Sequence, residues 1–293
     1  MTCLECYFKK NKISIGACEG DNKVVLCQIR TCNNGIAVED IICFEGTLTL
    51  IEKKMLYDYN LGKTKINVVL PSELIIQSYL ELPYMNSKNI IQYIEYELHR
   101  LYDIDADLYR FSYFPLGLKP NNENKFQRIL AMGLPIADMK QYKIKLNRLG
   151  FRTVSFISPL EARLMILRHI DAKIGKGVTL CLIYIDETVI DIFFYWQNDI
   201  ISTAHIKLPK KHLDKELIGI FDYFSMEYYD KIIHSIILTG NCNVIDKYID
   251  FFKELGYTAI WLDGELLGIS PLLKDECDLP AFYIDALGAA LYL

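Results

Sequence analysis

Three apolar runs in the second half of the chain decide the fold: residues 178–185 (VTLCLIYI), 189–196 (VIDIFFYW) and 200–208 (IISTAHIKL). They are rich in β-branched and aromatic residues, and short polar turns separate them at 186–188 and 197–199. Runs of this composition between tight turns are typical of strands joined by hairpins. We therefore predict a three-stranded antiparallel meander.

The same pattern of elements occurs near the start of the chain. Residues 12–16, 23–31 and 36–44 are predicted strands, joined by turns at 18–22 and 33–35. The two regions do not share their residues, so the repeat is one of pattern and not of sequence.

Each meander is followed by alternating helices and strands. After the first we expect a helix at 48–57 and a buried strand at 65–70. After the second we expect a helix at 213–228, a strand at 235–240, a helix at 244–255, a strand at 258–262 and a final helix at 283–293. This order is that of the duplicated actin/hexokinase-type (ribonuclease H-like) α/β fold. The alternative is an unrelated α/β protein whose doubling is coincidental.

Between the two copies lies a segment, residues 72–157, that this pattern does not need. It predicts a small inserted α/β subdomain with a strand at 73–82, a helix capped by Ser87, strands at 108–116 and 126–134, a helix ending at Gly150, and a strand at 152–157. Ser158-Pro159-Leu160-Glu161 is a capping box that starts the next helix. We expect residues 1–71 to form the first half of lobe 1, 158–177 to complete it, and 178–293 to form lobe 2.

Composition excludes some classes of function. The chain has 293 residues, 32 Lys and Arg against 37 Asp and Glu, and a formal net charge of -5. Basic runs are never longer than two residues, so we expect no nucleic acid partner. Apolar runs are far shorter than a bilayer span, so we expect a cytoplasmic protein without direct membrane insertion.

Six of the nine cysteines lie in the first 43 residues. Cys3 and Cys6 have the spacing of half a zinc knuckle or of a redox pair, but a second close pair is missing. We favour reduced thiols that behave as small apolar side chains, and we predict no metal site.

Several short segments, in this order along the chain, resemble the PilM-like family of type IV pilus assembly proteins. They are Leu70-Pro71-Ser72-Glu73-Leu74, Leu80-Glu81-Leu82-Pro83, Ile94-Glu95-Tyr96-Glu97, Leu149-Gly150-Phe151, Ser158-Pro159-Leu160-Glu161-Ala162, the helix around 220–229, Ile237-Leu238-Thr239-Gly240 and Ala286-Leu287-Gly288-Ala289-Ala290-Leu291.

The resemblance implies an actin-like protein with its insertion placed as in PilM and FtsA. Members of this family bind ATP between two lobes and hold the short cytoplasmic tail of a membrane-anchored partner, PilN. The cytoplasmic part of GspL, a type II secretion protein, is a related scaffold. The implied location is cytoplasmic, peripheral to the inner membrane through a PilN-like partner.

An actin-like nucleotide site needs two glycine-rich turns, each with an aspartate that helps to hold magnesium. Here Gly16 remains but Ser14 takes the acidic position, and Lys23 fits the family's lysine. The second turn offers Asp186 without a glycine, and the adenosine-side motif keeps only Gly240. We therefore expect no ATP hydrolysis and leave the binding of ATP and magnesium open. For Asp186 with Asp191, the alternative is a hairpin acid and an outward strand residue; for Gly16 and Gly240, it is turn glycines of structural origin.

No catalytic motif occurs, the five histidines are scattered, and we assign no catalytic residue. The predicted function is a scaffold of a type IV pilus or related secretion machine that binds a partner's tail. The first candidates for partner binding flank a strand and a helix of the insertion: Tyr79, Leu80, Tyr93, Tyr96 and Glu97. Packing of the subdomain is the alternative role for each of them. The alternative functions are an active Mg-ATP-binding actin-like ATPase or sugar-kinase relative, and an adaptor unrelated to pili.

Overall fold

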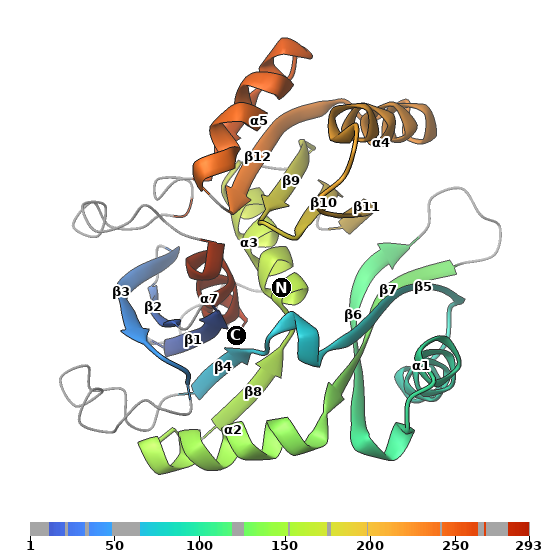
Figure 1. Ribbon diagram of the computed structural model, residues 1–293. Coiled ribbons are helices and arrows are strands. Elements are labelled where there is room, and N and C mark those ends of the chain that lie inside the picture. Colours follow the sequence, from blue (N-terminus) through green and yellow to red (C-terminus); the bar gives the residue numbers. More distant parts are fainter. Residues whose placement is uncertain are drawn as a thin grey trace, which may run out of the picture.

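The computed structural model describes residues 12–20, 23–32, 35–48, 65–118, 126–151, 153–174, 177–197, 199–240, 242–262, 267 and 281–292. The helix predicted at 48–57, apart from its first residue, and the pair Cys3 and Cys6 lie outside these residues. The chain forms two lobes with a smaller subdomain beside them (Figure 1).

The sheet of lobe 1 has five strands in the order β3-β2-β1-β4-β8. Strands β1, β2 and β3 form the antiparallel meander, while β4 is parallel to β1 and β8 is parallel to β4. The strands are β1 (Lys12–Gly20), β2 (Lys23–Cys32), β3 (Gly35–Glu45), β4 (Lys65–Val69) and β8 (Thr153–Ile157).

Lobe 2 repeats this arrangement in the order β11-β10-β9-β12-β13. Its meander is again antiparallel, and β12 and β13 again run parallel to their neighbours. The predicted doubled core is therefore confirmed. The elements are β9 (Thr179–Ile185), β10 (Val189–Trp196), β11 (Asp199–Lys207), α4 (Leu213–Glu227), β12 (Ile233–Gly240), α5 (Cys242–Glu254) and β13 (Ala259–Trp261).

Two equivalent helices, α3 (Pro159–Ile174) after β8 and α7 (Ala281–Leu291) at the end of the chain, pack together at the centre of the molecule (Figure 1). The backbones touch, because a Cβ atom on Gly288 of α7 would overlap the carbonyl oxygen of Ala162 of α3. On its other side α7 lies against β1, where a Cβ atom on Gly16 would overlap the carbonyl oxygen of Ala286.

The ends of these helices are also held by specific hydrogen bonds. The predicted capping box is confirmed: the backbone N–H of Ser158 donates to Glu161 Oε2 at 2.8 Å, and that of Glu161 donates to Ser158 Oγ at 3.1 Å. At the carboxyl end of α7, the buried Asn67 of β4 donates its amide to the carbonyl oxygens of Ala289 and Tyr292 at 2.8 and 2.6 Å. These bonds satisfy backbone groups that a helix end otherwise leaves without partners.

The inserted subdomain is a three-stranded sheet in the order β5-β7-β6 with a helix on one face. Its elements are β5 (Ile76–Pro83), α1 (Ser87–Tyr102), β6 (Tyr109–Leu118) and β7 (Phe126–Pro135). Asn86, not Ser87, caps α1, accepting from the N–H of Asn89 at 3.0 Å. The first strand begins later than predicted, because Ser72–Leu74 form a short 3-10 turn after Pro71.

The predicted end of the insertion at residue 157 is wrong. Strand β8 hydrogen-bonds to β4 and so belongs to the sheet of lobe 1. Helix α2 (Ile136–Leu149), which ends at Gly150 as predicted, covers the same sheet, since Leu146 and Leu149 pack in a cluster with Ile15. The inserted part therefore closes at the end of β7, and α2 with β8 returns the chain to the core.

The glycine contacts predict a large asymmetry between similar substitutions. Gly16→Ala and Gly288→Ala should each destabilise the fold by roughly 1–3 kcal/mol, since the methyl group meets backbone that cannot move aside. Gly219→Ala, on α4 with open space around it, is the control and should be neutral or stabilising by up to about 1 kcal/mol. Urea unfolding of the three variants measures this. Equal stabilities for all three would contradict the close crossing of α3 and α7.

Candidate functional site

The structure places the predicted nucleotide residues of lobe 1 at different points of the first hairpin. Gly16 is buried in the middle of β1 against α7 and does not lie in the turn, because β1 continues through Cys18 to Gly20. Lys23 is the first residue of β2, directly after the turn, and is exposed. Gly16 is thus explained by helix packing, and Lys23 alone lies at the hairpin end.

In lobe 2 the two predicted residues, Asp186 and Gly240, both have structural roles in the local backbone. Asp186 Oδ1 accepts from the N–H of Thr188 at 2.6 Å, from the hydroxyl of Thr188 at 2.9 Å and from the N–H of Val189 at 2.9 Å, which closes the hairpin turn. Gly240 has a φ of 124°, and a Cβ atom there would overlap the carbonyl oxygen of Ile185 at the end of β9. Only glycine fits this position.

A buried cluster of charges lies at the centre of the molecule. Arg163 on α3 binds Asp285 on α7 through two parallel hydrogen bonds of 3.0 and 3.1 Å. Its remaining nitrogen donates to Asp191 on β10 at 2.7 Å. The guanidinium also stacks over the ring of Tyr184 on β9, 3.3 Å from the ring centroid. All four side chains are buried, so helices and strands of both lobes meet at one cation.

This cluster lies between the strands that lead into the two hairpins. Tyr184 stands two residues before the second turn, and Cys18 stands two residues before the last residue of β1. Burial raises the pKa of the Cys18 thiol, and the charge of Asp285 adds to that shift. Burial opposes the charge on Arg163, but Asp285 and its neighbours more than offset this and raise its pKa, so it remains a cation.

His205 on β11 extends the cluster toward solvent. Its Nδ1 lies 2.7 Å from Asp191 Oδ1, and this hydrogen bond raises the pKa of the partly exposed imidazole. Two carboxylates face one guanidinium in the cluster, so a proton on His205 balances the charge. The alternative interpretation of Asp191 as an outward strand residue is wrong, because its side chain is buried between Arg163 and His205.

The five predicted partner-binding residues do not form one surface. Leu80 and Tyr93 pack inside the subdomain, between β5 and α1. Tyr79, on the other face of β5, is exposed. On α1, Tyr96 is exposed and Glu97 pairs with Arg100 at 2.7 Å.

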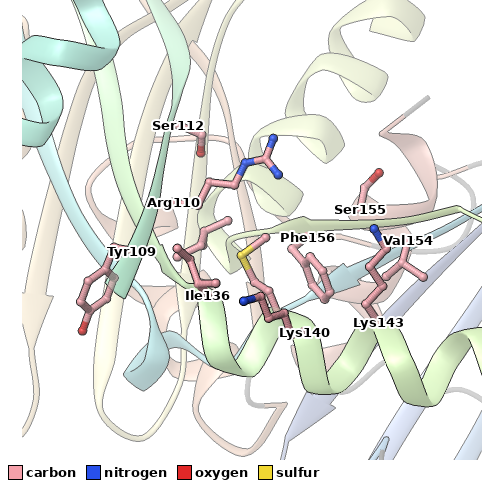
Figure 2. A pocket seen from close by; sticks show the side chains of 11 residues that line it. Tyr109, Arg110, Ser112, Ile136, Lys140, Lys143, Val154, Ser155 and Phe156 are labelled. Atoms are coloured by element: carbon pink, nitrogen blue, oxygen red, sulfur yellow. The ribbon is translucent and has the colours of Figure 1, made fainter. Parts of the chain in front are cut away.

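A pocket of about 600 Å³ lies on the face of the subdomain sheet that points away from α1, where the subdomain meets α2 and β8 (Figure 2). Three separate segments of the chain, in β6, α2 and β8, line the pocket together with Leu134 of β7. The lining residues are Tyr109, Arg110, Ser112, Leu134, Ile136, Met139, Lys140, Lys143, Val154, Ser155 and Phe156. We call this pocket the β6–β8 groove.

Two features of the groove point to a peptide ligand. Strands β6 and β8 are each the last strand of their sheet, so among the described strands each has one edge that no strand pairs, although β6 also packs against β11 of lobe 2. Both strands line the groove, and its surface is otherwise mainly apolar, with Ile136, Met139 and Phe156 (Figure 2). Unpaired strand edges beside apolar side chains are the usual place for an extended segment to bind.

Sequence reasoning missed both the cluster and the groove. For the cluster a signal exists in the last helix, where Asp285 is the single charge in an otherwise apolar stretch. Charges in such positions are buried only when paired. For the groove no local signal exists, because its residues come from β6, α2 and β8, and only the tertiary fold brings these together.

The buried cluster predicts a strong effect of one substitution. Arg163→Met should destabilise the fold by about 3–5 kcal/mol, because it leaves the carboxylates of Asp191 and Asp285 buried without their cation. The control is Arg100→Ala, which breaks an exposed ion pair with Glu97 and should behave as wild type. Denaturant unfolding compares the two, and similar midpoints for both variants would argue against the cluster.

The chain was compared with known proteins. No protein-family model and no curated protein sequence matches it. Among solved structures, the PilM-PilN type IV pilus biogenesis complex aligns with a TM-score of 0.67 at 12% identity, over 95% of this chain and 97% of that chain. A protein from Bacteroides thetaiotaomicron with an actin-like ATPase fold and unknown function aligns with a TM-score of 0.50 at 12% identity, over 89% and 94% of the two chains.

None of the described helices combines the length and the apolar character needed to cross a bilayer. At the identities above, the comparisons show the fold alone. The chain therefore has the duplicated actin-like α/β fold that the sequence predicts, and it shares this fold with a chain of the PilM-PilN complex over nearly the whole length of both.

Proposed function

We propose that the chain is an actin-like scaffold of a type IV pilus or related secretion machine, and that it holds the cytoplasmic tail of an inner-membrane partner in the β6–β8 groove. The observation that carries this proposal is the groove itself, with two strand edges and an apolar surface at the junction of the inserted subdomain and lobe 1. The likeness to PilM, whose solved structure is a complex with PilN, supports it.

The connection between the insertion and the core forms part of the groove. Strand β7 runs directly into α2, and α2 leads to β8, so one continuous segment forms two sides of the groove. An extended tail that pairs with either edge gains main-chain hydrogen bonds, and its alternate side chains reach the apolar surface. In this proposal the protein is cytoplasmic and peripheral to the inner membrane through its PilN-like partner.

The same proposal assigns no ATPase activity to the space between the lobes. A magnesium-triphosphate needs free backbone amides at the hairpins and a carboxylate for the metal's waters. Here Asp186 is engaged in its own turn, Asp191 and Asp285 share the single cation of Arg163, and Gly16 and Gly240 are in contact with protein backbone. These contacts of the described residues support the proposal that the cleft holds no Mg-ATP.

The first test uses peptides that cover the cytoplasmic tails of single-span membrane proteins of the source organism. At least one tail should bind, and Ser155→Trp, which fills the groove from β8, should weaken it by about tenfold or more. Met226→Trp, at an exposed position on α4 outside the groove, is the control and should bind as wild type. Fluorescence anisotropy measures both. If no tail binds, or if Ser155→Trp binds the tail equally well, the proposal fails.

The rival function, an active Mg-ATP-binding ATPase, is tested by thermal unfolding. Saturating Mg-ATP should change the melting temperature by less than about 1 °C relative to magnesium alone, because a ligand that does not bind the native state cannot stabilise it. A rise of several degrees would favour the rival function instead.

A further inference from the structure

We propose that the segment held in the β6–β8 groove is an acidic extended peptide, whose carboxylates are bound by Arg110, Lys140 and Lys143. This inference rests on the proposed function and names the chemistry of the ligand. It starts from the charges in the groove: among the residues that the structure describes, the lining includes three cations and no carboxylate.

The three cations stand on facing sides of the groove. Ile136, Met139, Lys140 and Lys143 are spaced so that they share one face of α2, where the two lysines are three residues apart. Arg110 comes from β6 on the other side, and Figure 2 shows all three beside the apolar side chains of Ile136 and Phe156. The groove therefore has an apolar surface flanked by positive charge.

These cations are not neutralised by the protein in its described part. Arg110, Lys140 and Lys143 are exposed, and no ion pair between any of them and a described carboxylate is formed. The contrast with the rest of the molecule is clear, because the chain as a whole carries a net charge of -5. A groove of opposite sign to its surroundings attracts an anionic ligand and repels a basic one.

Strand geometry specifies how the carboxylates are arranged. A segment that pairs with the edge of β6 or β8 is extended, so its side chains alternate between two faces. The face turned toward α2 meets Met139 together with Lys140 and Lys143, because these three side chains share one face of the helix. The expected ligand therefore carries apolar residues and Asp or Glu on the face that it turns toward the groove. A small phosphate compound would leave the strand edges and the apolar surface unused.

The experiment selects random dodecapeptides displayed on phage against three forms of the full chain: wild type, Arg110→Gln/Lys140→Gln/Lys143→Gln, and a control with the same change of charge, Lys88→Gln/Arg148→Gln/Lys215→Gln. The control cations are exposed and lie outside the groove. Peptides from wild type and from the control should be enriched in Asp and Glu, and those from the groove variant should not. Synthetic versions of the selected peptides should lose about two- to fivefold in affinity for each carboxylate changed to amide, and less at high salt.

The outcomes separate this inference from the proposed function. If peptides are selected that Ser155→Trp excludes, but their acidic content is equal on wild type and on the groove variant, the inference is wrong and the proposed groove remains. If no selected peptide is sensitive to Ser155→Trp, both fail. Retention of the wild-type melting temperature by the groove variant shows that a loss of acidic peptides is not a loss of folding.

Discussion

Helix α7 touches α3 on one side and β1 on the other with no side chain between the backbones, at Gly288 and Gly16. The rest of the structure depends on this contact. It fixes the distance at which the two lobes meet, and Asn67 fixes the end of the same helix from β4. The last helix of the chain is therefore built into the first sheet, so lobe 1 is complete only when residues from both ends of the sequence are in place.

The buried charges depend on the same crossing. Arg163 and Asp285 can form two parallel hydrogen bonds only because α3 and α7 lie so close, and Asp191 adds the second lobe to the pair. Burying such groups is costly, and a cluster of this kind adds little net stability compared with apolar residues of the same size. The cluster instead specifies how α3 and α7 are placed, since any other relative position of the helices would leave a buried charge without a partner.

Much of the fold could be predicted from the sequence because its signals are local. Turn residues between apolar runs gave both meanders, and Ser158 with Glu161 marked the start of α3. The boundary of the insertion could not be predicted in this way, because the pairing of β8 with β4 joins residues far apart in the chain. Gly16 shows the same limit: its sequence context suggested a phosphate turn, whereas its contact is with a helix at the other end of the chain.

The candidate sites show the same difference between local and long-range signals. Residues chosen for their position beside a single strand or helix, such as Leu80 and Tyr93, serve the packing of that element. The groove and the charge cluster are assembled from segments separated by tens to hundreds of residues, and neither has a motif of its own. A sequence read in short windows therefore finds the elements and misses the surfaces they build together.

The edges of β6 and β8 have one more consequence, for the protein alone. Open strand edges are templates on which copies of a chain can aggregate, and natural proteins often guard them with lysine or arginine. Arg110, Lys140 and Lys143 stand beside these edges. Two molecules that approached groove to groove would bring like charges together, so these residues oppose edge-to-edge pairing between copies of the chain.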